Sequence, residues 1–362
     1  WLLDAAVTNG KKLGEGGKLS GWSYSAGSGN RADNSNTQYA LLGLWAGRQA
    51  GATMDKAAWE SIHEFYKSSQ CDSKPNPRGQ DIAGWNYTNG SKAANSPTLT
   101  MTAAGVCGLL IAALEVNDNK QGLNEQTGIA AKCGIYPDDD AIAKGMRWLA
   151  QEFKFFNPPH TFYNVYGIER VGRLSGQRFI GDHDWYREGC EILTGVKQSQ
   201  GLAQKTGGEW MIDKSIDAFP VISTSFSLLF LAKGRTPILL SKLAWDSAAD
   251  RPGTATGWNR KHHDARHLVE YSSRELFKKL PLAWQIFDPR LADLSTDEKF
   301  NEELSNLLQS PVLYMNGHEA PVLTPAQKRL LRRYVDEGGF ILAEACCGSE
   351  EFTRGFKKLM ED

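Results

Sequence analysis

An internal repeat of about 62 residues constrains the fold of this chain more than any other feature of its sequence. In three places a tryptophan in a glycine-rich loop is followed by a threonine that opens an apolar stretch. The pairs are Trp22 and Thr37, Trp85 and Thr102, and Trp210 and Thr224. Successive threonines are 65 and 122 residues apart, and the second interval is close to twice the first. A further copy is therefore expected near residue 162, and Tyr163–Gly176 repeats the Gly-Arg-x-x-Gly pattern of Gly47–Gly51 there.

Each period predicts two helices of different character. The threonine-led stretches are apolar or small on nearly every side, which is typical of a helix that is buried all round. The other stretch of each period is amphipathic, as in Asp139–Phe153, where Ile142, Met146 and Leu149 fall on one helical face. The remaining amphipathic stretches are Thr53–Ser68 and Asp184–Val196. One inner and one outer helix per period predict an all-α array of hairpins, either a closed α/α toroid or a curved solenoid.

The tryptophan loops resemble the Gln-Trp repeats of the α/α-toroid family of terpenoid cyclases and protein prenyltransferases. Gln70 to Trp85 and Gln200 to Trp210 keep a glutamine upstream of the tryptophan. The resemblance covers residues 1–235 and implies a toroid that is incomplete at its N-terminus. Each indole is expected to cover a helix end while its N–H group finds a carbonyl oxygen.

The catalytic motifs of that family are absent from this chain. Asp182-His-Asp184 continues with tryptophan where cyclases require another aspartate, and Asp138–Asp140 does not continue as a diphosphate-binding Asp-Asp-x-x-Asp motif. His160 has no Asp-x-Cys partner of the kind that holds zinc in prenyltransferases. We therefore expect no cofactor and no assignable catalysis in the toroid, which would present a surface to a protein partner or an apolar small ligand. An isoprenoid-handling enzyme working in the toroid cavity is the alternative.

Charge and hydropathy exclude two other classes of protein. The chain has 41 Lys and Arg residues against 42 Asp and Glu residues, so it lacks the excess positive charge that favours nucleic-acid binding. The longest apolar and small stretch, Ala103–Leu114, is shorter than the ~18 residues of a spanning helix. Neither a nucleic-acid partner nor a transmembrane segment is expected.

Residues 236–267 are predicted to connect the toroid to a second domain. The end of this connector contains His263 and His267, which share a face if the segment is helical and have the spacing of a metal-binding pair. No third ligand accompanies them, so a polar helix start is the favoured interpretation and no metal site is assigned. The two histidines stay the weak candidates for one.

Residues 268–362 alternate between strand and helix patterns, which predicts an α/β Rossmann-like domain with a parallel sheet. Three strands are expected, at Trp284–Asp288, Val312–Gly317 and Phe340–Ala345. A capping box with proline at the first helical position begins a helix at Thr324. Because three strands are few for such a sheet, the domain is expected to be incomplete at its C-terminus.

Two motifs follow strands of this predicted sheet, where ligands bind in open parallel sheets. Gly317-His318-Glu319 follows the second strand, and Cys346-Cys347-Gly348-Ser349 follows the third. A helix N-terminus and a nearby histidine activate a cysteine at such a turn. The candidate catalytic residues are therefore Cys347, His318 and Glu319, and the candidate ligand contacts are Gly317, Gly348 and Ser349. Ligand contact or packing at the sheet edge is the other interpretation.

This segment resembles the class I glutamine-amidotransferase-like fold, whose nucleophilic cysteine occupies a similar turn. Here the glycine that precedes the family's nucleophile is missing, and His318 precedes the cysteine rather than following it. The whole chain is similar to uncharacterised bacterial proteins that join a toroid to the domain of unknown function numbered 4159. The segments that carry this resemblance are Arg170–Gly189, Thr224–Arg235 and Asn316–Ser349.

The family context implies the bacterial cell envelope or periplasm. The expected function is a binding or scaffold protein. A thiol-dependent hydrolase or amidotransferase-like activity in the second domain is an alternative to it, beside the isoprenoid-handling enzyme.

Overall fold

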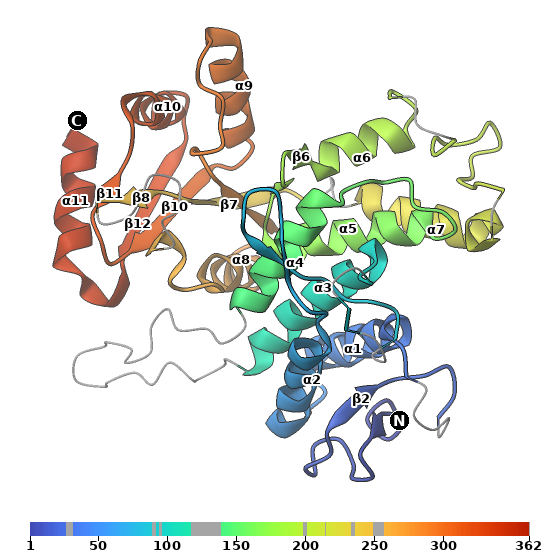
Figure 1. Ribbon diagram of the computed structural model, residues 1–362. Helices are drawn as coiled ribbons and strands as arrows, with labels where there is room; N and C mark the ends of the chain where they lie inside the picture. The colour runs from blue at the N-terminus through green and yellow to red at the C-terminus, as the bar shows by residue number, and fades with distance from the viewer. Residues whose placement is uncertain are drawn as a thin grey trace. The chain divides into compact units, whose positions relative to one another are not determined.

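The chain folds into two compact units, each with its own hydrophobic core. The described residues between 1 and 232 form a helical unit, and those between 236 and 361 form an α/β unit (Figure 1). This computed structural model describes residues 1–26, 32–88, 92–93, 96–116, 139–197, 201–213, 215–232, 236–248 and 257–361.

The helical unit has a helix in each stretch where the repeat predicts one. The helices of the threonine-led stretches are α1 (Asn34–Gln49), α3 (Leu99–Val116), α5 (Thr161–Ser175) and α7 (Pro220–Ala232). The amphipathic helices are α2 (Lys56–Ser69), α4 (Asp139–Gln151) and α6 (Trp185–Leu193). Short two-stranded ribbons in the loops pair β1 (Val7–Thr8) with β2 (Leu19–Gly21), β3 (Lys74–Pro75) with β4 (Asp81–Ile82), and β5 (Phe179–Ile180) with β6 (His183–Asp184).

The helices of the two kinds pack in a regular order. In the first set, α1 contacts α3, α3 contacts α5, and α5 contacts α7 (Figure 1). The amphipathic helices lie against this series, with α2 and α4 on α3 and α6 on α5. In the described part of the unit, each of the first three periods therefore contributes one helix to the series and one helix that lies against it.

The repeated tryptophan and threonine residues are joined by the same hydrogen bonds in three copies. The tryptophan backbone N–H donates to the threonine Oγ1 at 3.0 Å for Trp22, 3.1 Å for Trp85 and 3.1 Å for Trp210. Each indole N–H donates to a carbonyl oxygen, on Leu2, Tyr66 and Leu193 respectively. Tyr66 and Leu193 lie in the last turns of α2 and α6, where carbonyl groups lack helical partners. The fourth copy lacks the tryptophan, and Asn157 N–H donates to Thr161 Oγ1 instead.

Helix α3 is the most buried helix of the unit. It is the one described helix with the length and apolar composition of a membrane span, but 83% of that window is buried, so a transmembrane segment is not indicated. Its glycines allow neighbours to approach closely. A Cβ atom on Gly105 would lie 2.1 Å from the Trp85 ring, and one on Gly108 would lie 2.4 Å from the Tyr66 ring. The small residues of α3 therefore make room for two fully buried aromatic rings.

The α/β unit is built around a parallel sheet of four described strands. Its spatial order is β12, β10, β7, β9 (Figure 1). The strands are β7 (Ile238–Leu243), β9 (Ala283–Phe287), β10 (Val312–Gly317) and β12 (Phe340–Ala345). The helices are α8 (Asp264–Glu275), α9 (Asp297–Leu307), α10 (Pro325–Asp336) and α11 (Glu350–Glu361). A short ribbon pairs β8 (Asp246–Ser247) with β11 (Pro321–Val322), and a 3₁₀ turn covers Gly257–Asn259.

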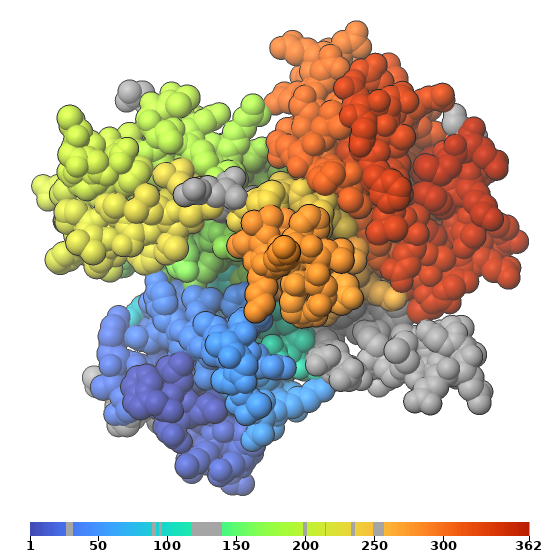
Figure 2. All heavy atoms as spheres, turned by 180° about the vertical axis from the view of Figure 1, so that it is seen from behind, coloured from blue at the N-terminus to red at the C-terminus, as the bar shows by residue number. Residues whose placement is uncertain are grey.

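The helices of this unit cover its sheet. Helix α8 packs against β7 and β9, and both α10 and α11 pack against β12. In the space-filling view the orange and red atoms of the unit form a closely packed body on the face shown (Figure 2). The capping box at Thr324 is confirmed, because its hydroxyl accepts from Gln327 N–H while the Gln327 side chain accepts from Thr324 N–H.

The sheet contains one strand more than the sequence analysis expects. Strand β7 lies in the stretch 236–267 that was assigned to the connector, yet it is a central strand, paired with β9 and β10. Its sequence ILLSKL ends with a buried serine, lysine and leucine and lacks the alternation of a half-exposed strand. The polar residues Ser241 and Lys242 hide the strand from a hydropathy pattern, although both are fully buried.

Candidate functional site at the carboxyl edge of the sheet

The strand order of the α/β unit gives its sheet a switch point. The first strand, β7, lies between β9 and β10, so the chain leaves β7 toward one side and later returns to its other side at β10. In sheets of this type the crossover connections diverge at such a point, and ligands bind outside the carboxyl ends of the strands there. The site is therefore expected where β7, β10 and β12 end.

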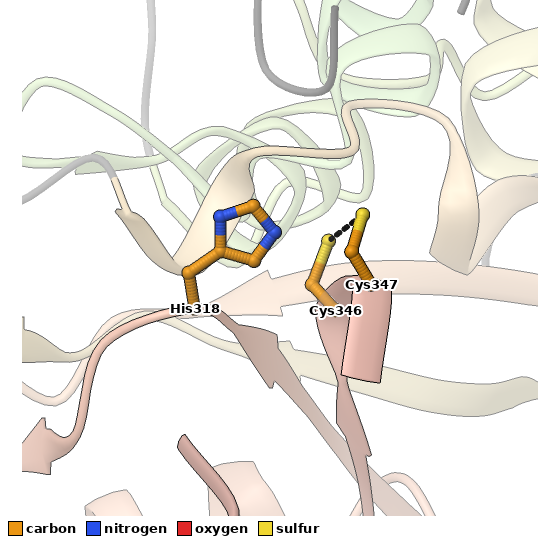
Figure 3. Close-up of side chains that lie close together, drawn as sticks. All are labelled: His318, Cys346 and Cys347. Carbon is orange, nitrogen blue, oxygen red and sulfur yellow. Dashed lines mark hydrogen bonds between the residues drawn. The ribbon is translucent and has the colours of Figure 1, made fainter. Parts of the chain in front are cut away.

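Three side chains with lone-pair donor atoms converge at this edge. His318 follows β10, while Cys346 and Cys347 follow β12, and the donor atoms of all three lie within 4.8 Å of one another. The two sulfur atoms are 3.9 Å apart. Figure 3 shows the imidazole of His318 facing the two thiols. Cys346 is fully buried, whereas Cys347 and His318 are partly exposed, so the group is open to solvent on the Cys347 and His318 side.

The turn after β12 holds the two cysteines in an unusual backbone conformation. Cys347 has φ 54° and ψ 27°, the left-handed region that non-glycine residues rarely adopt, and Gly348 follows with φ 73°. Ser349 then accepts a hydrogen bond from Phe352 N–H at the start of α11 and donates one to the carbonyl oxygen of His318. The Ser349 hydroxyl thus ties the histidine loop to the cysteine turn.

Gly317 allows the end of β10 to pass beneath a tryptophan ring. A Cβ atom on Gly317 would lie 2.3 Å from the Trp245 indole, which is fully buried. Any larger residue would displace this ring or the strand end that carries His318. The structure therefore gives Gly317 a packing role, and gives Ser349 the role of a helix cap.

Burial and a charged neighbour both lower the pKa of His318. Burial lowers the pKa of His318 below its ordinary value of 6.5, and the positive charge of Arg260 lowers this pKa further. Burial by itself would raise the pKa of Glu319. The hydrogen bond from the Arg260 guanidinium outweighs that effect, so the pKa of Glu319 lies below its ordinary value of 4.5. At neutral pH the site therefore holds a neutral imidazole beside an ionised carboxylate.

A buried ion pair joins β7 to the first residue of α8 in the same unit. Lys242 on β7 is 1% exposed, and its ammonium donates to Asp264 Oδ1 at 2.7 Å, Asn259 Oδ1 at 2.9 Å and the Lys261 carbonyl oxygen at 2.9 Å. A negative charge on Cys346 would raise the pKa of Lys242. Sequence reasoning missed this lysine, and the one signal for it is a charged residue within an otherwise apolar strand.

A group of three hydrogen-bonded polar side chains lies on the neighbouring strands β10 and β12. The Tyr314 hydroxyl donates to Glu344 Oε2 at 2.7 Å and accepts from Asn316 Nδ2 at 3.3 Å. Tyr314 and Asn316 are on β10 and Glu344 is on β12, so these side chains share one face of the sheet near its carboxyl edge. These hydrogen bonds give the buried Tyr314 hydroxyl both a donor and an acceptor.

The structure brings together some of the predicted site residues and not others. Cys347 and His318 lie in one cluster, and Cys346, which is not among the candidate residues of the sequence analysis, belongs to it as well. Glu319 is adjacent in sequence but is held by Arg260. His263 and His267 have ring centroids 6.0 Å apart, and among the described residues they do not belong to any group of three metal-ligating side chains.

The motifs weighed in the helical unit have structural roles where they are described. Asp184 caps α6 by accepting from Arg187 N–H, and it pairs with Arg178 at 2.9 Å. His160 precedes α5 and lies near the Tyr163 ring. Asp139 begins α4, while Asp138 lies outside the described residues. Within the described part of this unit, no three His, Cys, Asp or Glu side chains cluster at metal-ligand spacing.

Comparison with known proteins assigns one part of the chain. Residues 289–362 match the model of a domain of unknown function, DUF4159. The matched segment includes α9, β10, α10, β12 and α11, and with them His318, Cys346 and Cys347. No curated protein and no solved structure matches the chain.

Proposed function

We propose that this chain is a ligand-binding protein whose α/β unit holds a small ligand at the carboxyl edge of its sheet. The observation that carries this proposal is the convergence of His318, Cys346 and Cys347 beside the switch point. Three soft or borderline donor groups converge there from two separate loops, and two of them, Cys347 and His318, are partly exposed. The helical unit is proposed to be an α/α-toroid-like scaffold that presents a surface to a partner.

Aromatic packing favours a scaffold over an isoprenoid-handling enzyme in the helical unit. Aromatic side chains of α1, α5 and α7 contact one another: the Tyr39 and Tyr163 rings are tilted with centroids 6.1 Å apart, and the Tyr166 and Phe226 rings are stacked with centroids 5.2 Å apart. The Arg170 guanidinium lies 4.4 Å from the centroid of the Tyr166 ring. These rings fill space beside α1, α5 and α7 that an apolar substrate would otherwise need.

Native mass spectrometry of the full-length protein purified from its source tests the binding proposal. The native mass is expected to exceed the denatured mass by that of a bound ligand. His318→Gln is expected to lose most of that ligand, because a contact worth about 1.4 kcal/mol already changes affinity tenfold. Cys190→Ser, a cysteine of α6 in the helical unit, is the matched control and is expected to retain it. Equal native and denatured masses for the wild type would contradict the proposal.

A thiol-dependent hydrolase or amidotransferase-like activity is the second candidate. It is favoured by the left-handed conformation of Cys347 between β12 and α11, since strained residues at strand-to-helix turns often carry nucleophiles. His318 stands close enough to accept the thiol proton after a small rotation, and its lowered pKa keeps the imidazole neutral at pH 7.

Iodoacetamide labelling against pH tests the second candidate. An activated Cys347 is expected to react at about pH 6.5 at least tenfold faster than a free cysteine, whose pKa is about 8.5. His318→Gln is expected to return the rate to that of free cysteine, and the rate at Cys190 serves as the internal reference. If Cys346 and Cys347 both react only as fast as free cysteine, this candidate fails.

A further inference from the structure

We propose that His318, Cys346 and Cys347 form a three-ligand site for a thiophilic, tetrahedrally coordinated divalent metal ion of the zinc type. This inference rests on the proposed ligand-binding function, because the ion would hold the small ligand at the same edge of the sheet. The donor set is two thiols and one imidazole, which is a set that zinc prefers over harder cations such as magnesium or calcium.

The geometry of the two sulfur atoms suits such an ion. With zinc–sulfur bonds of about 2.3 Å and tetrahedral angles, two thiolate ligands are separated by about 3.8 Å. The Cys346 and Cys347 sulfurs are 3.9 Å apart, so they already span one edge of that tetrahedron. The third donor atom, on His318, lies within 4.8 Å of both sulfurs, whereas a tetrahedral zinc ion would hold a nitrogen about 3.5 Å from each sulfur, so a shift of no more than about 1.3 Å is needed.

The histidine has a buried donor atom that an ion would satisfy. His318 Nε2 is buried and has no hydrogen-bond partner among the described residues. Buried polar atoms without partners are rare in folded proteins, and a bound ion or water is a common reason for one. This observation is independent of the sulfur spacing and concerns the other loop of the site.

Charge balance favours the same ion. Metal binding deprotonates both cysteines, and two thiolates with a neutral imidazole cancel the charge of a divalent cation. A neutral centre carries a smaller desolvation cost than an isolated ion when one ligand, Cys346, is fully buried.

The site leaves a fourth coordination position for an exogenous ligand. Glu319 does not join the three donor atoms, because its carboxylate is held by Arg260. Three protein ligands with one open position are typical of zinc sites that bind water or a substrate, whereas purely structural sites have four. The exposed Cys347 and His318 side is where that fourth ligand would enter.

Metal titration of the full-length protein tests this inference. The protein is stripped with a chelator, kept reduced with a phosphine that does not bind zinc, and titrated with Zn²⁺ against a chromophoric chelator. Co²⁺ then replaces Zn²⁺, because tetrahedral cobalt shows visible d–d bands, and each thiolate ligand adds near-ultraviolet charge-transfer absorption. Wild type is expected to bind one equivalent with both cobalt signatures.

Four single variants decide between ligand and bystander residues. Cys347→Ser and His318→Gln are expected to weaken Zn²⁺ binding at least about 100-fold, because even outer-shell partners of a metal contribute about 10- to 100-fold. Cys347→Ser is also expected to lose about half of the charge-transfer absorption. Cys190→Ser and His267→Gln are the matched controls and are expected to bind as the wild type does. Both site variants change partly exposed side chains, which limits their effect on folding.

The outcomes separate this inference from the proposed function. If wild type binds Zn²⁺ no better than Cys347→Ser, or if His267→Gln alone abolishes binding, the three-ligand site is wrong. If an organic ligand is still retained in the native mass under those results, the ligand-binding proposal stands without the metal. If the zinc-loaded protein retains nothing except zinc, the metal site stands and the small-ligand proposal fails.

Discussion

Replacing Trp85 by alanine is expected to lower the free energy of unfolding of the helical unit by about 3–5 kcal/mol. The Trp85 side chain is fully buried, and its indole N–H donates to the Tyr66 carbonyl oxygen at 2.9 Å. Its ring fills the space left by Gly105 on α3 and lies close to Gly145 on α4. Truncation leaves a cavity at the junction of three helices, together with a carbonyl group that has lost its partner.

Hydrogen exchange measured by mass spectrometry on peptides from α3 reports this loss locally. Protection of those peptides is expected to fall by about two to four powers of ten, since 1.4 kcal/mol corresponds to a factor of ten. Trp1→Ala removes the same side chain at a position that is 85% exposed, and is the matched control. Equal protection in Trp85→Ala and Trp1→Ala would show that the tryptophan repeat does not stabilise the helix array.

Replacing Asp264 by alanine is expected to destabilise the α/β unit by about 3–5 kcal/mol, because it leaves a buried lysine without its counter-charge. Lys242 is 1% exposed, and Asp264 is its carboxylate partner at 2.7 Å. The two hydrogen bonds to Asn259 and the Lys261 carbonyl oxygen remain but carry no negative charge. Replacing both charged residues, as Lys242→Met with Asp264→Ala, is expected to recover most of the loss.

The pH dependence of the Asp264→Ala variant follows from the lysine. Burial lowers the pKa of Lys242 below its ordinary value of 10.5, and loss of the Asp264 carboxylate lowers this pKa further. Between the folded and unfolded pKa values the unfolded chain binds more protons, so the free energy of unfolding rises with pH up to about 10.5. The Asp264→Ala variant is therefore expected to regain stability as the pH rises toward about 10.5.

Urea denaturation at several pH values, read from exchange of β7 and β10 peptides, measures this effect. The double variant lacks the buried lysine, so its stability is expected to show no corresponding rise with pH. If Asp264→Ala unfolds with the same free energy as the wild type, or if its loss does not shrink as the pH rises, Lys242 is not charged in the folded protein.

Much of the fold was predictable because its signals are local. Apolar periodicity located the helices, the spacing of tryptophan and threonine located the repeat, and the capping box located the start of α10. The hydrogen bonds between each tryptophan and its threonine span 14 to 17 residues, and they recur because each copy repeats the same local residues. Strand β7 was missed because its last residues are polar and their burial depends on partners far along the chain.

In the candidate site, too, the features with local signals were predictable and those that depend on contacts between loops were not. His318 and Cys347 were singled out because each follows a strand, and the carboxyl ends of parallel strands share one edge. Three other features of the site depend on which loops meet in space. Cys346 joins the cluster, Arg260 holds Glu319 away from it, and Lys242 pairs with Asp264.

The sequence by itself determined the helical repeat, most strands of the sheet and the two loops that carry the thiols and the imidazole. These follow from periodicity, capping and turn chemistry, which act over a few residues. Three features became visible in the tertiary structure alone. Strand β7 is central in the sheet, Lys242 and Asp264 form a buried ion pair, and the three donor atoms lie within 4.8 Å of one another. The physical reason is that burial and pairing are properties of contacts between distant segments, and these contacts form only when the whole sheet closes.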